Sequence, residues 1–206
     1  MQIITRQVAI DNLKKYIGKD LRKLALKFSI TTYETGKQNK GWKGLILERL
    51  AGLENNVSKA PNGLSWELKS VSFHNKKEIL VPKETMAITM INPEELKQHS
   101  FFESHCWAKL KSIIFCAVMW HGQNAENAEL IKVVSLDFLE TDELIQEIKA
   151  DYDFIRNKLI AQGFEALTGT DGKWIQARTK GAGHGSTSRA FYARTSLVKK
   201  IFETAK

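Results

Sequence analysis

The sequence predicts a mixed α/β fold, because segments with helical periodicity alternate with segments that have the two-residue periodicity of strands. The chain has 206 residues, of which 43% are hydrophobic, enough to bury the core of one domain or of two lobes that share a core. Its formal charge of +8 favours a polyanionic partner, since binding to phosphates releases condensed counterions. On charge alone, the alternative is a soluble basic protein that has no polyanionic partner.

The amino-terminal part is predicted to be helical. Apolar residues recur at helical spacing over residues 7–28, with lysines between them, and Gly18 is the expected break between two amphipathic helices. A basic loop over residues 35–41 leads into a third helix, which we expect over residues 42–50 with its end near Gly52.

The rest of the chain supplies the strands and two further helices. Apolar residues with polar residues between them, and runs of β-branched and aromatic residues, predict strands over residues 64–73, 83–91, 109–119 and 174–179. Dense charge at helical spacing predicts a helix over residues 141–162, with Thr141 as its cap, and residues 196–205 are predicted to form the last helix. A glycine-rich loop, residues 181–185, follows the last strand.

The spacing of cysteines and histidines argues against common redox and zinc motifs. Cys106 and Cys116 lie in an apolar stretch at a spacing that fits neither a CxxC pair nor a zinc knuckle, so we expect reduced thiols in the core. The five histidines have no ligand spacing. The amino terminus has no long apolar run and no small-residue cleavage site, so we expect a cytoplasmic protein without a membrane segment.

The strongest indication of chemistry lies in SKAPNGLSWELK, residues 58–69. Glu67 and Lys69 are two positions apart on a predicted strand, so their side chains project from the same face. A carboxylate there can hold Mg²⁺ while the ammonium acts on the attacking water and neutralises phosphate charge, as phosphodiester hydrolysis requires. A turn next to Asn62 can bring its amide to the same metal, and Glu48 is a further candidate acid. A solvated strand face is the alternative interpretation of Glu67 and Lys69.

Six segments resemble, in order and with similar intervening lengths, motifs of the MutH-like endonucleases, the strand-nicking mismatch-repair enzyme and its restriction-endonuclease relatives. The segments are residues 39–52 (NKGWKGLILERLAG), 58–71, 82–85 (PKET), 109–111 (KLK), 172–180 (GKWIQARTK) and 189–194 (RAFYAR). The resemblance implies a restriction-endonuclease-like mixed β-sheet flanked by helices, with two lobes around a DNA cleft. We expect a catalytic lobe mainly within residues 1–110 and a DNA-reading lobe mainly within residues 111–206.

The resemblance also implies the site, carried over position by position. The implied catalytic residues are Glu48, Asn62, Glu67, Lys69 and Lys109, and the implied metal-site residues are Asn62, Glu67 and Leu68. The expected DNA contacts are Lys40, Gly41, Arg178, Lys180, His184, Arg189 and Tyr192, of which His184 is included because its loop is rich in glycine. The implied cofactor is Mg²⁺, for which Mn²⁺ or Ca²⁺ can substitute in binding.

The resemblance implies that Arg178 and Lys180 are the base-reading pair, and this assignment has an independent physical basis. An arginine fork can hydrogen-bond guanine O6 and N7 together, and such a pair is worth roughly 1–3 kcal/mol of discrimination. The alternative for Arg178 and Lys180 is a solvated strand face that binds phosphates without reading sequence. Tyr192 is implied to face the surroundings of the target adenine, or else is a buried aromatic residue at the rim.

Two departures from the family pattern bear on function. The stretch between Lys180 and Arg189 is short, which favours a type II restriction enzyme over the repair nickase. Asn62 stands where the family has a catalytic aspartate, which removes a full charge from the metal site. The chain is then either an engineered Asp-to-Asn variant of an active nuclease, or a natural weak nuclease or non-cleaving DNA-binding subunit. We expect a bacterial protein that binds double-stranded DNA, as a monomer or a homodimer.

Overall fold

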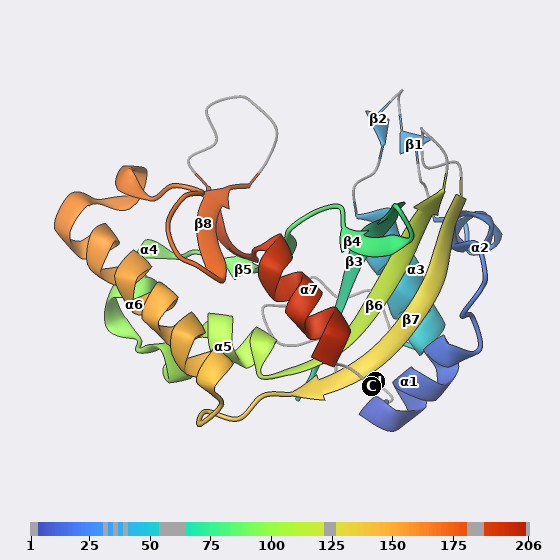
Figure 1. Cartoon of the computed structure of the whole chain (residues 1–206), viewed down its shortest axis with the longest axis horizontal. Coiled ribbons are helices and arrows are strands. Elements are labelled where there is room, and N and C mark those ends of the chain that lie inside the picture. Colours follow the sequence, from blue (N-terminus) through green and yellow to red (C-terminus); the bar gives the residue numbers. More distant parts are fainter. Residues whose placement is uncertain are drawn as a thin grey trace. The chain divides into compact units, whose positions relative to one another are not determined.

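A computed structural model describes residues 4–30, 33–34, 37–38, 41–53, 65–121, 127–180 and 188–204 (Figure 1). Its helices are α1 (Arg6–Lys14), α2 (Leu21–Lys27), α3 (Trp42–Ala51), α4 (Pro93–Gln98), η1 (Phe101–Glu103), α5 (His105–Leu110), α6 (Glu143–Gln162), η2 (Phe164–Ala166) and α7 (Thr195–Thr204). Its strands are β1 (Tyr33–Glu34), β2 (Lys37–Gln38), β3 (Glu67–Lys76), β4 (Ile79–Pro82), β5 (Met86–Met90), β6 (Ser112–His121), β7 (Asn127–Asp137), β8 (Ile175–Thr179) and β9 (Arg189–Ala193). The predicted mixed α/β class is confirmed.

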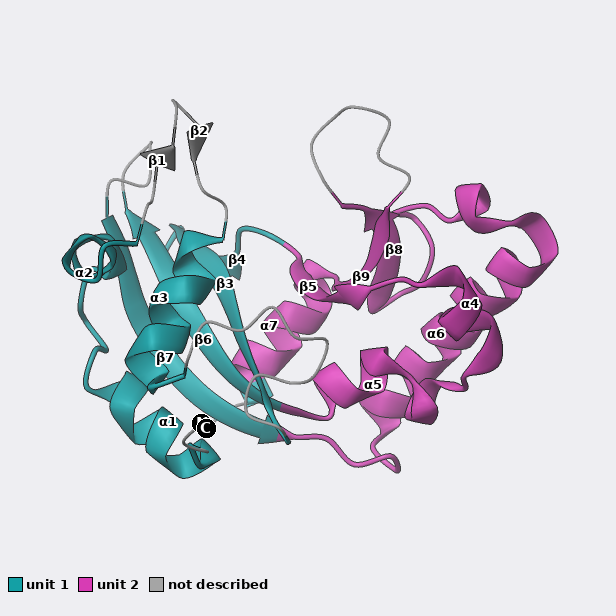
Figure 2. Cartoon of the chain, turned by 180° about the vertical axis from the view of Figure 1, so that it is seen from behind, with its two compact units in different colours: residues 1–84, 113–136, 204–206 teal, residues 85–112, 137–203 magenta. Residues whose placement is uncertain are grey.

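The chain forms two compact units, which Figure 2 colours separately. Unit 1 consists of residues 1–84, 113–136 and 204–206, and unit 2 consists of residues 85–112 and 137–203. Each unit therefore takes its residues from more than one stretch of sequence, and the first crossing falls between Glu84 and Thr85.

Unit 1 is built on a four-stranded mixed sheet in the order β4-β3-β6-β7. β3 runs parallel to β6, with Glu67 opposite Ile113, and antiparallel to β4. Successive side chains of a strand point to opposite faces. The core on one face combines residues of β3 and β6 with residues of α1, α2 and α3, among them Leu68, Ile114, Cys116, Val118, Leu13, Leu21, Trp42 and Ile46.

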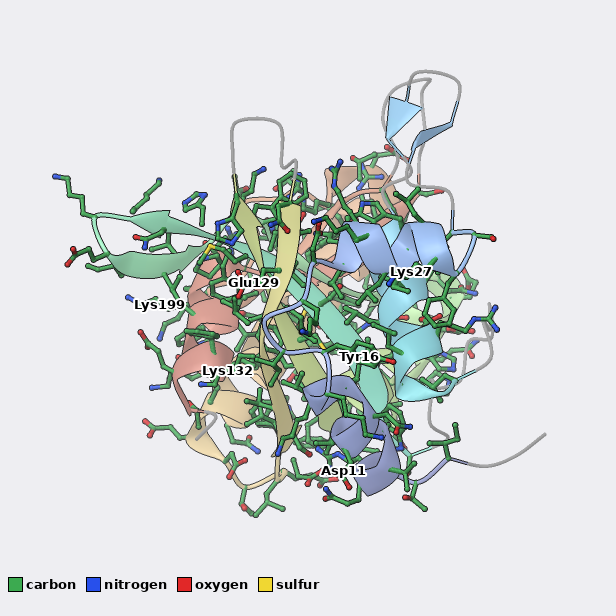
Figure 3. All side chains as sticks on the ribbon, turned by 90° about the vertical axis from the view of Figure 1, so that its right-hand side faces the viewer. Asp11, Tyr16, Lys27, Glu129, Lys132 and Lys199 are labelled. Carbon is green, nitrogen blue, oxygen red and sulfur yellow. The ribbon has the colours of Figure 1, made fainter. Side chains whose placement is uncertain are left out.

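Local chemistry explains where the helices of unit 1 begin and end. Thr5 caps α1 by accepting a hydrogen bond from the amide of Val8 at 3.3 Å. Asp20 caps α2 and also accepts from the amide of Ala128 in β7 at 3.2 Å, which ties the helix to the sheet. α3 ends at Gly52 in the left-handed conformation, φ 90°, as its sequence predicts. Figure 3 shows the side chains that these elements carry, among them the exposed Lys27 of α2.

Unit 2 combines a three-stranded antiparallel sheet, in the order β5-β9-β8, with α4, α5 and the long helix α6. Tyr152 of α6 stacks on Phe191 of β9 with ring centroids 5.3 Å apart, and Phe101 and Trp107 extend the aromatic cluster. The odd-numbered residues of β8 and β9 thus turn toward the core, which leaves the even-numbered residues on the other face.

Several predicted elements need correction. The predicted strand over residues 109–119 begins as α5, because Ser104 caps a helix by accepting from the amide of Trp107 at 3.2 Å; Lys109 is therefore helical. The predicted strand over residues 83–91 shortens to β5, and the sequence reading missed β4. In the turn between β3 and β4, Lys77 and Glu78 have positive φ. Glycine or asparagine usually occupies such positions, so the sequence carries no turn signal here.

Other expectations are confirmed with small shifts. α1 and α2 are separate helices on either side of Gly18, and α6 begins after Asp142 rather than Thr141. Cys106 and Cys116 are both buried and free. Among the described residues, no helix has both the length and the apolar character needed to cross a membrane. The predicted glycine-rich loop lies outside the described residues.

Candidate functional site

Glu67 and Lys69 form an ion pair at the start of β3. Lys69 Nζ donates to Glu67 Oε1 at 3.0 Å, and both side chains project from the face of the sheet opposite Leu68. Glu67 is only 5% exposed. Its neighbours along this face include the buried apolar residues Val71 and Phe73, which are unusual surroundings for a carboxylate. The predicted pairing of these two residues is thus present in unit 1.

The burial of Glu67 constrains what this carboxylate can do. An ionised carboxylate in such surroundings needs compensating positive charge, because desolvation alone strongly disfavours its charged form. Lys69 supplies one positive charge on one oxygen atom. A carboxylate and a strand carbonyl are the hard oxygen donors that divalent cations prefer, so the donor chemistry at Glu67 and Leu68 fits such an ion.

A second polar cluster joins α3 to β3. Lys43 of α3 is buried, and its Nζ donates to Ser72 Oγ and, at 2.7 Å, to Glu84 Oε1. Glu84 also accepts from the amide of Ser72 at 3.1 Å. Burial acts to raise the pKa of Glu84, but the charge of Lys43 and the hydrogen bonds from Lys43 and Ser72 outweigh it and hold the pKa below its usual value. This cluster fixes α3 on the strand that carries Glu67.

The other predicted catalytic and metal-site residues lie on other elements or outside the described residues. Glu48 is half-buried on α3, the helix that packs toward the Leu68 side of β3, so its place in the same centre remains a proposal. Lys109 lies in the last turn of α5, in unit 2. Asn62 lies outside the described residues. No group of three or more His, Cys, Asp or Glu side chains suited to a metal ion occurs within the described ranges.

Among the residues expected to contact DNA, Arg178, Lys180 and Tyr192 belong to one sheet face of unit 2. The register places Gln176 opposite Tyr192, and alternate residues along β8 share its face, so Arg178 lies on the same side. Lys180 directly follows β8, and its amide continues the pairing by donating to the Ser188 carbonyl at 2.9 Å, so we assign it to that face as well. The guanidinium carbon of Arg178 is 5.4 Å from the centre of the Tyr192 ring. Both Arg178 and Lys180 are exposed.

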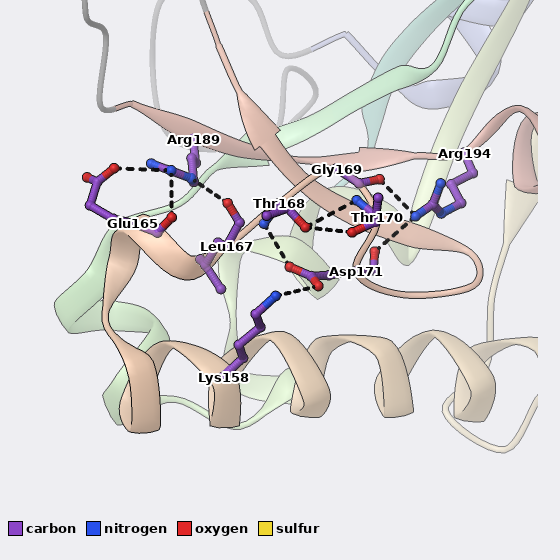
Figure 4. Close-up of polar contacts among 9 residues, drawn as sticks. All are labelled: Lys158, Glu165, Leu167, Thr168, Gly169, Thr170, Asp171, Arg189 and Arg194. Carbon is purple, nitrogen blue, oxygen red and sulfur yellow. Dashed lines mark hydrogen bonds and ion pairs between the residues drawn. The ribbon is translucent and has the colours of Figure 1, made fainter.

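The remaining predicted DNA contacts have different surroundings. Gly41 is the exposed cap residue of α3, whereas Lys40 and His184 lie outside the described residues. Arg189 is only 8% exposed, and it donates to the backbone carbonyls of Leu167 at 2.9 Å and Glu165 at 3.3 Å (Figure 4). These contacts give Arg189 a structural role within unit 2.

The turn that precedes β8 is held by charged side chains, of which Asp171 is buried. Arg194 donates to the carbonyls of Gly169 and Gly172, both at 2.9 Å, and Asp171 accepts from Lys158 at 2.7 Å (Figure 4). Burial acts to raise the pKa of Asp171, but the hydrogen bonds from Lys158 and the Thr168 amide hold it below its usual value.

The buried Asp151 of α6 ties the same turn to the long helix. It accepts hydrogen bonds from the backbone amides of Lys173 at 2.7 Å, Trp174 at 2.6 Å and Ile175 at 2.9 Å. The strand that carries Arg178 thus starts from a fixed point.

Sequence reasoning missed three residues with structural contacts around these groups: Lys43, Asp151 and Thr85, whose hydroxyl accepts a hydrogen bond from Arg178 Nη1 at 3.2 Å. Each is a polar residue whose partners lie far away in sequence, so no local spacing reveals it. The one available signal was Asp151 itself, an acid on the apolar face of a predicted helix, where a charged residue requires a partner.

Comparison with known proteins connects these features. The family model described as "DNA mismatch repair enzyme MutH" matches residues 54–151, which include Glu67 and Lys69. The "DNA mismatch repair protein MutH" of Escherichia coli O17:K52:H18 (strain UMN026 / ExPEC) is 23% identical over 197 residues, covering 94% of this chain and 84% of the relative. The protein of the same name from Escherichia coli O127:H6 (strain E2348/69 / EPEC) matches to the same extent. These matches support the resemblance of this chain to the MutH-like endonucleases, and they cover nearly its whole length.

Proposed function

We propose that this DNA endonuclease nicks one strand of double-stranded DNA in mismatch repair, with a divalent metal ion as cofactor. The observation that carries the proposal is a match to mismatch-repair proteins along 94% of the chain. The type II restriction enzyme favoured by the sequence rested on the short stretch between Lys180 and Arg189. A loop length is a weaker argument than a match along nearly the whole chain. We therefore favour the nicking enzyme over the restriction enzyme as the function of this protein.

Glu67 and Lys69 are the residues to which we assign the chemistry. Glu67 would hold the metal ion, and the burial of its carboxylate at the start of β3 supports this role. Lys69, which donates a hydrogen bond to Glu67 Oε1, would orient the attacking water and neutralise charge that develops on the phosphate. A bound divalent ion would lower the pKa of a coordinated water and stabilise charge at the phosphate.

The metal ion that we propose is Mg²⁺, held by Glu67, the Leu68 carbonyl and residue 62. An amide oxygen at Asn62 is neutral, so it preserves shape while removing one negative charge from the ligand set. We therefore expect weak metal binding and slow cleavage by the chain as it stands. Replacing Asn62 with aspartate would restore the charge and raise activity by orders of magnitude. A chain that binds DNA without cutting it is the second candidate, and Asn62 is the observation that favours it.

For DNA recognition we propose the sheet face that carries Arg178, Lys180 and Tyr192. Two exposed cations on one face suit an anionic duplex, and the +8 charge of the chain favours the same partner. Lys40, Gly41 and His184 remain proposed DNA contacts.

A supercoiled plasmid distinguishes the candidates in one experiment. Nicking converts it to an open circle, whereas cleavage of both strands converts it to a linear form. We expect the Asn62→Asp chain with Mg²⁺ to accumulate open circle well before any linear product. Direct appearance of linear DNA would restore the restriction enzyme. A sequence-selective gel shift without cleavage in Mg²⁺ or Mn²⁺, unchanged in the Asn62→Asp chain, would support the non-cleaving subunit.

A further inference from the structure

Two side chains from other parts of the sheet, Thr85 and Tyr192, contact Arg178. Its Nη1 donates to Thr85 Oγ1 at 3.2 Å, and its guanidinium carbon lies 5.4 Å from the centre of the Tyr192 ring. Thr85 immediately precedes β5, Tyr192 lies on the central strand β9 and Arg178 lies near the end of β8. All three residues belong to unit 2. Contacts within the protein thus position Arg178 before any DNA is bound.

The sheet register explains why these residues meet. β9 lies between β5 and β8, and Tyr192 pairs with Ala87 on one side and Gln176 on the other. Arg178 is two residues beyond Gln176, so its long side chain reaches the ring along a diagonal of the sheet. Thr85 is two residues before Ala87 and approaches the same guanidinium from the opposite edge strand.

Two restraints on one guanidinium suit base reading better than they suit folding. Arg178 is exposed and its bond to Thr85 lies at the surface, where such a bond adds little to stability. The bond uses one of the five N–H donors of the guanidinium, and the Nε–Nη2 edge retains the fork geometry that matches guanine O6 and N7. Fixing a flexible arginine before binding reduces the entropy that is lost when it meets the base.

We propose that Thr85 is a specificity-determining positioning residue, whose hydroxyl orients Arg178 for bidentate recognition of a guanine. The proposal rests on the proposed function of this face as the DNA-reading surface. Thr85 itself makes no contact with the base. Its effect on DNA binding passes entirely through Arg178, with the Tyr192 ring as the second support.

The test measures binding, so it does not depend on residue 62 being competent for cleavage. A duplex pool with a randomised centre, in Ca²⁺, selects the preferred site of the unmodified chain. Each guanine of that site is then replaced by 7-deazaguanine, which lacks the N7 acceptor. We expect one replacement to weaken binding by the unmodified chain by about tenfold, the scale of a lost base contact.

Three variants then isolate the hydroxyl of Thr85. Thr85→Val keeps the shape without the acceptor, and we expect it to weaken binding to the selected site about three- to tenfold and to shrink the penalty for 7-deazaguanine toward one. Thr85→Ser keeps the acceptor and should behave as the unmodified chain. In an Arg178→Lys background, Thr85→Val should have no further effect. The salt dependence of binding should stay unchanged, because Thr85 carries no charge to set against a phosphate.

The outcomes separate the inference from the function on which it rests. Undiminished 7-deazaguanine discrimination in Thr85→Val, or equal losses in Thr85→Val and Thr85→Ser, overturns the role of the hydroxyl while site-selective binding remains. A further loss on adding Thr85→Val to Arg178→Lys overturns the route through Arg178. If neither the unmodified chain nor the Asn62→Asp chain selects any sequence, the reading function of this face fails, and the inference fails with it.

Discussion

The buried Lys43 offers the sharpest test of how unit 1 holds its chemistry together. Replacing it with methionine keeps a long, unbranched side chain but removes the donor to Ser72 and the partner of Glu84. Breaking a fully buried ion pair costs about 3–5 kcal/mol, whereas an exposed pair is worth at most about 1 kcal/mol. The side chain of Lys43 is 11% exposed and that of Glu84 is 47% exposed, so water partly compensates Glu84.

We therefore expect Lys43→Met to lower the free energy of unfolding by about 2 kcal/mol, between these limits. For a chain of this length that corresponds to a fall of roughly 4–8 °C in Tm. Lys149→Met is the matched control, because Lys149 pairs with Asp153 one helical turn away and both side chains are more than a third exposed. The control should change stability by less than about 0.5 kcal/mol in the same urea and thermal unfolding experiments.

The pH dependence adds an independent check. The pKa of Glu84 is lowered in the folded protein, so its stabilising contribution is complete above the unfolded pKa of about 4.3 and is lost as the pH falls through the folded value. The difference in stability between the unmodified chain and Lys43→Met should thus be full at pH 7 and shrink below about pH 4.3. If Lys43→Met unfolds like the Lys149→Met control at pH 7, the proposed anchor between α3 and β3 is refuted.

Four further variants or measurements test the packing of the two units. Gly172→Ala should destabilise the protein by about 3 kcal/mol, because φ is +79° and an added Cβ would lie 2.0 Å from the Ile175 carbonyl oxygen. Gly44→Ala adds its Cβ in open space within α3 and should instead stabilise the protein by up to about 1 kcal/mol. Equal Tm shifts in the two variants would refute both predictions. Asp151→Asn should cost about 2–3 kcal/mol, because the new amide nitrogen cannot accept from backbone N–H groups, and hydrogen exchange at the amide of Ile175 should accelerate. Burial raises the pKa of Cys116 to about 12, so iodoacetamide at pH 8 should label it only after unfolding in urea, and rapid labelling of the native protein would contradict the buried position.

The sequence was most informative where chemistry is local. The spacing of Glu67 and Lys69 predicted a shared face, and the structure brings the two side chains together at 3.0 Å. Gly52 similarly predicted the end of α3 from a single residue. Such features depend on strand alternation or on one backbone conformation, so a short stretch of sequence contains all the information that they need.

Features that depend on long-range partners were beyond the sequence. Lys43 reads as a surface lysine of an amphipathic helix, and its burial follows only from the later positions of Ser72 and Glu84. Arg189 reads as a basic residue of a DNA-binding motif, yet its guanidinium satisfies carbonyls that a distant turn presents. The family resemblance implied two lobes, but local patterns could not show which stretches each unit combines, because those stretches are separated in the chain.

We propose that Glu67 is a catalytic-site residue of a strand-nicking DNA endonuclease. The rate at which the first strand of a plasmid is cut tests this proposal most directly. The Asn62→Asp chain provides the background, with Glu67→Gln as the test and Glu78→Gln, an exposed glutamate at the β3–β4 turn, as the control. We predict that Glu67→Gln lowers the rate of open-circle formation from supercoiled plasmid in Mg²⁺ by at least about a hundredfold, while Glu78→Gln leaves it unchanged. Equal nicking by all three proteins would contradict the assignment of Glu67, and so would the complete absence of nicking in the Asn62→Asp background.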